Sequence, residues 1–387
     1  MKNYNAVFIL PGISIKYPPG GYDIVYRLAN GLNKKGISTA IIFLKDNKYV
    51  PNYFDTIKKS MAYEMACVAL NNIFYGKRLS YFYHCWKLLS NLFFKVDYDY
   101  KLLKNVDCYL YSKIEDIKFN TKIIFATSWE TAYFVNEYVK LKGESTKACY
   151  LIQNSEDDKS FSGRNSNLAK KTYKFKFKKI VINKNLYKRF AKEKPLFFHV
   201  GIDTEFYKVM PGIEKDSVMF PLRKSKSKGA KYAIQCIKKL IKNYKQIKII
   251  TFGDFTNNEI PQSIRYKISH YYLPTRSQLR ILYNKSKIFI LPSLIEGMPL
   301  PPLEAMACEC AVITTDNGGV NEYTANNVNC LLCPTKNSTC LYTKIVYLLK
   351  NKDKRQQLVR IGLETAKQYN YEKMINSFIK LIKRIDS

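Results

Sequence analysis

Apolar and polar positions alternate along this chain in the pattern of a parallel α/β fold. Short apolar runs, typical of buried strands, end in polar or glycine-rich loops, and these lead into segments with apolar residues at helical spacing. The predicted strands cover residues 5–11, 37–44, 122–127, 147–153, 179–183, 218–222, 247–252, 287–292, 311–315 and 330–334. The predicted helices cover residues 22–34, 232–240, 279–283, 303–308, 339–350, 354–369 and 371–385. Because helices follow most strands, neighbouring strands are expected to run parallel.

The length of the chain divides this pattern into two domains. At 387 residues the chain is long for a single hydrophobic core. The string Val200–Asp203 closes the first series of strands, and the second series begins near Ser217. We therefore expect domains at residues 1–205 and 206–370, followed by an amphipathic helix in 371–387.

The stretch Leu291–Tyr323 holds the candidate chemistry. Glu296 follows a predicted strand, and Glu304 lies in the first turn of the next helix. The carboxyl edge of a parallel sheet is where such folds bind ligands, and a carboxylate there accepts hydrogen bonds from the paired hydroxyls of a sugar or ribose. For two isolated glutamates, a solvated loop acid and an acid that complements the helix dipole explain the pattern at least as well.

The complete string carries more information than the two acids. It reads EGMPLPPLEAMA over Glu296–Ala307 and GGVNE over Gly318–Glu322. This string resembles the nucleotide-sugar signature of retaining GT-B glycosyltransferases of family four. The resemblance implies two doubly wound, Rossmann-like domains facing across a cleft. Residues 1–205 would then bind the acceptor and 206–370 the nucleotide sugar, with the helix in 371–387 packing back on the first domain.

The resemblance also implies roles for residues of the second domain. Glu304 would hold the ribose hydroxyls, and Glu296 would orient a hydroxyl of the donor sugar. Phosphate and sugar would lie against the backbone of Gly297, Met298, Pro299 and Leu300. Arg223 and Lys228 match the arginine and lysine that neutralise the leaving diphosphate in this family. From the residues alone, they fit one more basic loop in a basic protein equally well.

Five further candidates lie in the first domain. Gly20 and Gly21 match a family loop that faces the donor diphosphate and the acceptor, although a plain flexible turn explains them equally well. The candidates for the acceptor side are Ser128, Trp129 and Glu156, which follow two predicted strands. Glu156 begins a run of three acids, which a solvated loop explains at least as well. Many relatives carry a histidine near the position of Ser128, and this chain has none there. The segments ATSWETAYFV and YLIQNSEDDKSF are loosely similar to bacterial rhamnosyltransferases of polysaccharide synthesis.

These expectations together describe a reaction. A sugar passes from a nucleoside-diphosphate sugar to an acceptor hydroxyl with retention at the anomeric carbon, and no cofactor or metal is required. The acceptor would be a glycan or a lipid-linked glycan of bacterial cell-surface synthesis. Two other classes stay open: a non-catalytic GT-B subunit, and a nucleic-acid-binding α/β protein.

The charge of the chain bears on its partners. It carries 64 Lys and Arg against 31 Asp and Glu, a formal net charge of +33. Such a surplus suits nucleic acid, an anionic membrane or anionic small molecules. Because no nucleic-acid-binding module is recognisable, we expect no nucleic-acid partner and favour an anionic membrane surface. The aromatic, lysine-rich segment 51–105 is predicted to be helical, either contacting that surface or packing as an ordinary helix pair. The triplet Asp97–Asp99 is discounted as a metal motif.

Cysteine usage and hydropathy bear on location. The chain has 10 cysteines, and no apolar run reaches the roughly 18 residues of a membrane span. We expect free thiols in the cytoplasm, with the protein peripheral on the inner face of the cell membrane. Cys308 with Cys310, and Cys330 with Cys333, are expected to pack in the interior rather than to bind zinc.

Overall fold

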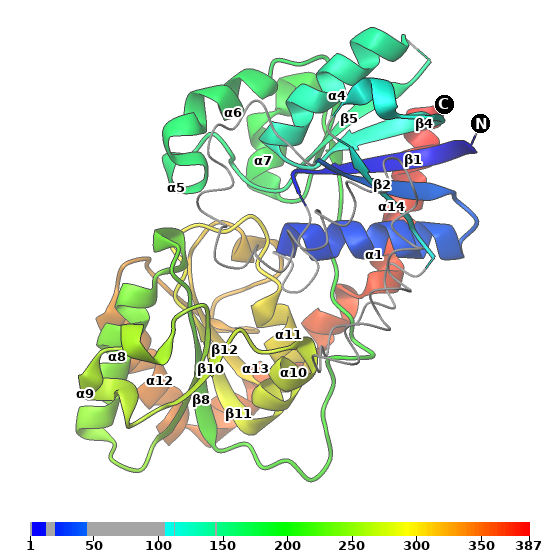
Figure 1. Ribbon diagram of the computed structural model, residues 1–387. Coiled ribbons are helices and arrows are strands. Elements are labelled where there is room, and N and C mark those ends of the chain that lie inside the picture. The colour runs from blue at the N-terminus through cyan, green and yellow to red at the C-terminus, as the bar shows by residue number, and fades with distance from the viewer. Residues whose placement is uncertain (1, 13–19, 45–104, 112, 144) are drawn as a thin grey trace, which may run out of the picture. The chain divides into compact units, whose positions relative to one another are not determined.

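The computed structural model describes residues 2–12, 20–44, 105–111, 113–143 and 145–387 (Figure 1). The chain forms two compact units. Unit 1 comprises Met1–Val181, Leu186–Phe198 and Ile375–Ser387, and unit 2 comprises Ile182–Asn185 and His199–Met374. The predicted helical segment 51–105 lies, except for its last residue, outside the described residues, as does the triplet 97–99.

Unit 1 is built on a seven-stranded sheet in the order β3-β2-β1-β4-β5-β6-β7, in which all the paired strands are parallel. Its strands are β1 Lys2–Leu10, β2 Thr39–Leu44, β3 Asp107–Tyr111, β4 Phe119–Ala126, β5 Lys147–Ile152, β6 Lys178–Val181 and β7 Leu196–Phe197. Its helices include α1 Gly20–Lys34, α4 Trp129–Lys142, α5 Lys159–Ser162, α6 Ser166–Thr172 and most of α7 Lys184–Arg189, whose first two residues belong to unit 2. Figure 1 shows α1 and α4 on opposite faces of this sheet.

The last helix, α14 (Tyr371–Asp386), contributes to the core of unit 1. Its Phe378 is fully buried, and its ring lies against the rings of Phe8, Phe125 and Phe198. Gly31 of α1 lies so close to α14 that an added Cβ would meet Ile375 at 2.4 Å. The apolar face of α14 therefore completes a core that begins with the first strand of the chain.

Unit 2 is built on a six-stranded sheet in the order β10-β9-β8-β11-β12-β13, again with parallel pairs. Its strands are β8 Ser217–Leu222, β9 Lys248–Gly253, β10 Ser269–Tyr272, β11 Ser286–Leu291, β12 Ala311–Thr315 and β13 Leu331–Cys333. Its helices are α8 Ala230–Asn243, α9 Gln262–Arg265, α10 Arg276–Lys285, α11 Pro301–Ala307, α12 Ser338–Lys350 and α13 Lys352–Gln368. Two Rossmann-like parallel sheets confirm the predicted α/β class.

Alternate residues of each central strand of unit 2 point to opposite faces of the sheet, as strand geometry requires. Val218, Phe220 and Ile288 join a fully buried cluster with α8 and α12. On the other face, the ring of Phe289 lies against Tyr283 of α10. Both faces of the sheet are covered, which is why its strands read as continuous apolar runs rather than as alternating ones.

The strand order of unit 2 creates a topological switch point between β8 and β11. The chain leaves β8 towards β9 on one side and leaves β11 towards β12 on the other. The loops at the carboxyl ends of these two neighbouring strands therefore diverge, which is the arrangement that makes a ligand crevice in open α/β sheets. The switch point places the loop 223–229 beside the loop 292–300.

No helix among the described residues is long and apolar enough to cross a membrane. Cys308, Cys310, Cys330 and Cys333 are all buried. Within the described part of the chain, no three His, Cys, Asp or Glu side chains gather as metal ligands would.

Unit 1 buries two carboxyl groups near the carboxyl ends of β4 and β5. Glu130 is 9% exposed and Glu156 is 8% exposed. The Tyr150 hydroxyl donates to the Glu156 carboxylate, and the Glu156 backbone N–H donates to the Tyr173 hydroxyl at 2.9 Å. Burial raises the pKa of Glu156 well above its usual value, and the charge of Glu130 raises it further, although the bond from Tyr150 opposes the shift. The structure therefore favours the protonated form of Glu156.

We predict that Glu156 makes the stability of unit 1 fall as the pH rises. A carboxyl group with a raised folded-state pKa contributes fully below its unfolded value, 4.5, and less as the pH rises from there towards the folded value. Each unit of pKa difference corresponds to about 1.4 kcal/mol. Glu156→Gln, which imitates the protonated acid, should flatten the loss of unfolding free energy between about pH 5 and about pH 7.

The measurement is urea unfolding followed by the fluorescence of Trp129, which is buried in unit 1. A Trp86→Phe background removes the chain's other tryptophan. Glu115→Gln, at an exposed acid of the same unit, is the matched control and should keep the wild-type pH dependence. Equal slopes for the Glu156 and Glu115 variants would contradict the assignment.

Candidate functional site

The loops after β8 and β11 are locked together by their backbones. Gly229 has φ +69°, and a Cβ added to it would lie 2.0 Å from the Pro292 carbonyl oxygen. Beside this contact, the Leu294 N–H donates to the Ser227 carbonyl at 2.7 Å. Glycine is required at position 229 both for its left-handed conformation and for this close approach. The two loops therefore hold a fixed register where the strand order reverses.

This register brings together two of the predicted site residues. Lys228 ends the short 3-10 turn Lys226–Lys228, and its Nζ lies 2.8 Å from Oε2 of Glu296. The Glu296 side chain is 11% exposed and that of Lys228 is 33% exposed. Partial burial strengthens such a contact relative to a surface pair. Glu296 thus holds Lys228 at the carboxyl edge of the sheet, and part of the lysine side chain stays accessible to solvent.

The predicted partner cation, Arg223, is held by a different acid. Its Nε lies 3.5 Å from Oδ2 of Asp254, the residue that follows β9. Oδ1 of Asp254 accepts from the Lys224 backbone N–H at 2.7 Å, which fixes the start of the same loop. The Arg223 side chain is 46% exposed. Sequence reasoning did not single out Asp254, because one acid after a strand carries no motif.

The loop after β12 packs beneath Glu296. The Glu296 N–H donates to the Asn317 carbonyl at 3.1 Å, and Asn317 Oδ1 accepts from the Val320 N–H at 3.2 Å. A Cβ on Gly319 would lie 2.6 Å from the Gly297 carbonyl oxygen. The Gly-Gly of the signature therefore lets this loop approach the acidic loop closely. Loops from the three adjacent strands β8, β11 and β12 form one interlocked surface.

The segment from Gly297 to Leu300 is anchored by side chains from elsewhere in unit 2. Asn183 Nδ2 donates to the Gly297 carbonyl at 2.8 Å, and the Tyr323 hydroxyl donates to the Pro299 carbonyl at 2.5 Å. Burial raises the pKa of Tyr323 well above its usual value, so the hydroxyl keeps its proton and continues to donate. Met298 is 8% exposed and packs inward, whereas Leu300 is half-buried at the start of α11.

Glu304 lies in the first turn of α11, where Pro301 and Pro302 begin the helix. The Tyr283 hydroxyl of α10 donates to Oε2 of Glu304 at 2.9 Å. Tyr283 is fully buried, and burial together with the Glu304 charge raises its pKa well above the usual value. A tyrosine that keeps its proton thus orients one oxygen of a half-buried carboxylate in the first turn of α11.

Two polar groups near these loops were also missed by sequence reasoning. Ser293 Oγ and Asn317 Nδ2 are buried and have no hydrogen-bond partner within the described residues. Buried polar groups are usually satisfied, so such atoms are candidates for contact with a ligand or water. The sequence offered no signal for them, because Ser and Asn after strands are common in ordinary turns.

The remaining candidates lie in unit 1. Gly20 and Gly21 were expected in the loop before the helix, but they are the first residues of α1. The N–H groups of a first helical turn have no intrahelical acceptor. The Gly21 carbonyl accepts from Gln153 Nε2 at 3.4 Å, so the start of α1 lies beside the end of β5. Ser128 precedes α4, and Trp129 at its start is 5% exposed. Glu156 is buried as described above.

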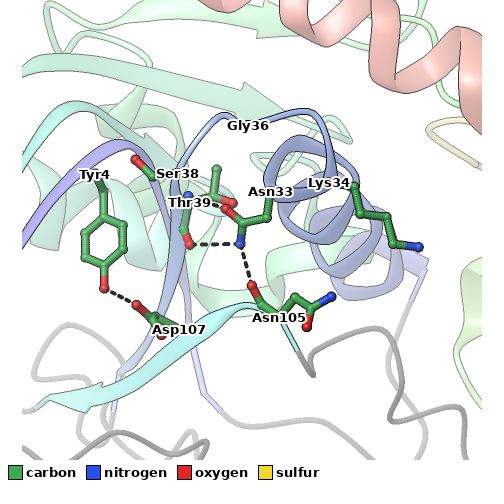
Figure 2. A pocket seen from close by; sticks show the side chains of 8 residues that line it. All are labelled: Tyr4, Asn33, Lys34, Gly36, Ser38, Thr39, Asn105 and Asp107. Atoms are coloured by element: carbon green, nitrogen blue, oxygen red, sulfur yellow. Dashed lines mark hydrogen bonds between the residues drawn. The ribbon is translucent and has the colours of Figure 1, made fainter.

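A separate polar pocket lies at the amino ends of β1, β2 and β3 (Figure 2). Its volume is about 450 Å³, and it is lined by Tyr4, Asn33, Lys34, Gly36, Ser38, Thr39, Asn105 and Asp107. Asn33 Nδ2 donates to the Asn105 carbonyl at 2.8 Å, and the Tyr4 hydroxyl donates to Asp107. None of the predicted site residues lines this pocket.

Part of the chain matches a known protein family and a curated relative. Residues 206–365 match the family model described as glycosyl transferases group 1. An N,N'-diacetylbacillosaminyl-diphospho-undecaprenol alpha-1,3-N-acetylgalactosaminyltransferase of Campylobacter jejuni is 35% identical over 115 residues, which are 30% of this chain and 31% of that protein. The chain thus spans about a third of the length of this relative.

Two other similarities extend over nearly the whole chain. An uncharacterized glycosyltransferase of Haemophilus influenzae is 22% identical over 93% of this chain and 95% of its own length. The crystal structure of Anabaena Alr3699/HepE with UDP and glucose superimposes with a TM-score of 0.71, at 13% identity, over 99% of this chain and 100% of that one. The structural match shows the shared fold. The match to the glycosyl transferases group 1 model thus covers the interlocked loops, in a chain that has glycosyltransferase homologues and shares its fold with GT-B glycosyltransferases.

Proposed function

We propose that this chain is a glycosyltransferase that moves a sugar from a nucleoside-diphosphate sugar to an acceptor hydroxyl. The observation that carries the proposal is the Lys228–Glu296 pair, 2.8 Å apart at the switch point of unit 2, within residues that match the family model. A fixed cation beside a fixed acid suits a ligand that carries both a diphosphate and a hydroxylated sugar.

In this proposal Lys228 and Arg223 stabilise the diphosphate as it leaves. An ammonium group has three N–H donors, so Lys228 can contact Glu296 and phosphate oxygens together. Glu296 holds the lysine in place and turns its other lone pairs towards a donor-sugar hydroxyl. Because the partners of the two cations come from different loops, both charges are positioned before the ligand binds, which is how electrostatic stabilisation of a transition state is obtained.

Glu304 is proposed to hold the two ribose hydroxyls of the nucleotide. Tyr283 fixes one of its oxygens, and the half-buried position limits competition from water. The backbone of Gly297 to Leu300, anchored by Asn183 and Tyr323, is proposed to lie along the phosphate and the sugar. The leaving diphosphate takes the acceptor proton, and the reaction proceeds with retention. Because Alr3699/HepE was crystallised with UDP and glucose, a uridine nucleotide is the first donor to test.

Unit 1 is proposed to bind the acceptor. Gly20, Gly21 and Ser128 lie at the carboxyl edge of its sheet, where the start of α1 approaches the end of β5. Trp129 and Glu156 face the interior, so we assign them to the support of this edge rather than to direct acceptor contact. The name of the Campylobacter relative includes a lipid carrier, diphospho-undecaprenol, which makes a lipid-linked glycan the first acceptor class to test.

We predict that Glu304→Ala lowers kcat/KM for nucleotide-sugar hydrolysis by about 100-fold. Loss of two hydrogen bonds to a carboxylate costs about 3 kcal/mol, which corresponds to this factor. Tyr283→Phe, which only releases one carboxylate oxygen, should cost about 1 kcal/mol, or about five-fold. The measurement is release of nucleoside diphosphate from a panel of UDP, GDP, dTDP and ADP sugars.

Glu205→Ala is the matched control, because the Glu205 side chain is 91% exposed in the same unit. It should retain wild-type activity. Hydrolysis by the Glu304 variant at the control's rate would contradict the proposed nucleotide site. Nucleotide binding without turnover would favour a non-catalytic subunit, and salt-sensitive binding to DNA or RNA that ignores Glu304→Ala would favour a nucleic-acid-binding protein.

We also propose that unit 1 docks on an anionic membrane surface, where a lipid-linked acceptor would be found. Exposed lysines gather in residues 164–194, and Glu193 is the sole acid of this segment. Phe175 and Phe177 alternate with Lys174, Lys176 and Lys178 and are only partly buried. Lysines near an anionic surface contribute about 1 kcal/mol each, and this contribution falls with ionic strength.

A vesicle sedimentation experiment tests this surface. The wild type should bind vesicles that contain phosphatidylglycerol at low salt and should bind pure phosphatidylcholine vesicles much less. Reversing four lysines to glutamate at 170, 171, 174 and 176 should abolish binding. The same reversal of the lysines at 231, 238, 242 and 245, around α8 of unit 2, changes the net charge equally and should leave most of the vesicle binding. Equal losses of vesicle binding in the two four-lysine variants would contradict the proposed surface.

A further inference from the structure

Two cysteines of unit 2 lie in direct contact. Cys333 is the last residue of β13, and Cys340 lies in the first turn of α12. Their Sγ atoms are 2.7 Å apart, with the Cys340 thiol donating to Cys333. Cys333 is buried, whereas Cys340 is only partly buried. Of the eight described cysteines, these are the two whose sulfur atoms are in mutual hydrogen-bond contact.

Local structure fixes this contact. The short connection Pro334–Asn337 turns the chain from β13 into α12, and the Asn337 side chain accepts from the Cys340 backbone N–H at 2.8 Å. This cap determines where α12 begins and therefore where Cys340 lies relative to the strand. Leu341 and Ile345 bury the same helix against the sheet. The two thiols are thus held together by the fold rather than by a flexible loop.

The environments of the two thiols differ in a way that suits stepwise exchange. The partly exposed Cys340 can be reached by a small disulfide in solution, whereas Cys333 is reached through Cys340. Burial raises the pKa of Cys333, and Cys340 raises it further, while Lys344, one turn along α12 from Cys340, lowers it. A buried thiol is a poor nucleophile towards solvent molecules but can attack a sulfur that is already beside it.

We propose that Cys333 and Cys340 form a reversible disulfide by exchange with low-molecular-weight disulfides such as oxidised glutathione. Cys340 loses its proton, and its thiolate attacks one sulfur of the oxidant. A mixed disulfide forms between Cys340 and that sulfur, the S–S bond of the oxidant breaks, and the other sulfur leaves as a thiolate that takes up the proton. Cys333 then loses its proton and attacks Cys340 Sγ, which displaces the second thiolate. Two protein thiols are oxidised to one disulfide, and one disulfide is reduced to two thiols.

The position of this pair connects it to the interlocked loops. The Cys333 carbonyl accepts from the Asp316 N–H at 2.8 Å, and the neighbouring Asn317 carbonyl accepts from the Glu296 N–H at 3.1 Å. A disulfide would therefore tie α12 covalently to the strand that supports the loop beneath Glu296. Formation of this bond does not depend on the proposed glycosyltransferase activity, so the two can be tested separately.

Peptide mapping of the full chain tests the proposal. The protein is treated with oxidised glutathione, remaining thiols are blocked at acid pH, and it is digested with trypsin without reduction. Cleavage after Lys336 and Lys344 releases Asn337–Lys344, whose sole cysteine is Cys340. We expect this peptide to be linked to Ile288–Lys336 with a loss of about 2 Da, the mass of two hydrogen atoms, and to be released by reduction.

Variants identify the partner, because Ile288–Lys336 also contains Cys308, Cys310 and Cys330. Cys333→Ala should abolish the linkage, whereas Cys330→Ser, at a buried cysteine of the same peptide, should leave it intact. Circular dichroism of the reduced proteins checks that both variants are folded. A linkage that survives Cys333→Ala, or wild-type protein that forms only the glutathione adduct at Cys340, would overturn the proposal.

Discussion

The close approach of Gly229 to the Pro292 carbonyl is the constraint on which the candidate site depends. Parallel topology sends the loops after β8 and β11 in opposite directions, and by itself this would leave them apart. A glycine in the left-handed conformation lets the backbones meet, and the Leu294–Ser227 hydrogen bond holds them there. The contact between Lys228 and Glu296 follows from that meeting. The positive charge of Lys228 is therefore positioned by the packed backbone of the two loops, which is stiffer than a lysine side chain alone.

The rest of the site is organised by buried groups of the same unit. Tyr283 precedes the string Glu296–Ala307 in the chain and Tyr323 follows it. Each donates from a buried hydroxyl, one to Glu304 and one to the Pro299 carbonyl. Burial keeps both protonated, so their orientation does not change across the physiological pH range. A site whose polar groups are fixed by its own core loses little free energy in reorganisation when a charged ligand arrives.

The sequence predicted the central strands and the two parallel sheets because strands buried on both faces read as unbroken apolar runs. It did not predict β3, β7 or β10, which are edge strands of their sheets. β7 has only two residues, and the tyrosines and polar residues of β3 and β10, with His270 in β10, lack that apolar pattern. Glu296, Glu304, Arg223 and Lys228 were identified by a linear motif and by loop position, but their pairing was not, since Lys228 and Glu296 are 68 residues apart. The burial of Glu156 was also missed, because a run of acids resembles a solvated loop until Tyr150 is placed beside it.

The most direct test of the account compares two glycines by calorimetric titration with whichever of UDP, GDP, dTDP or ADP the wild type binds best. Gly229 and Gly212 both have positive φ, +69° and +81°, but only at Gly229 would a Cβ meet neighbouring backbone. Alanine therefore imposes a similar conformational strain at both positions and breaks the loop contact at one. The account predicts at least about a ten-fold loss of affinity, about 1.4 kcal/mol, for Gly229→Ala, with Gly212→Ala close to wild type. Equal affinities for the two folded variants would contradict it.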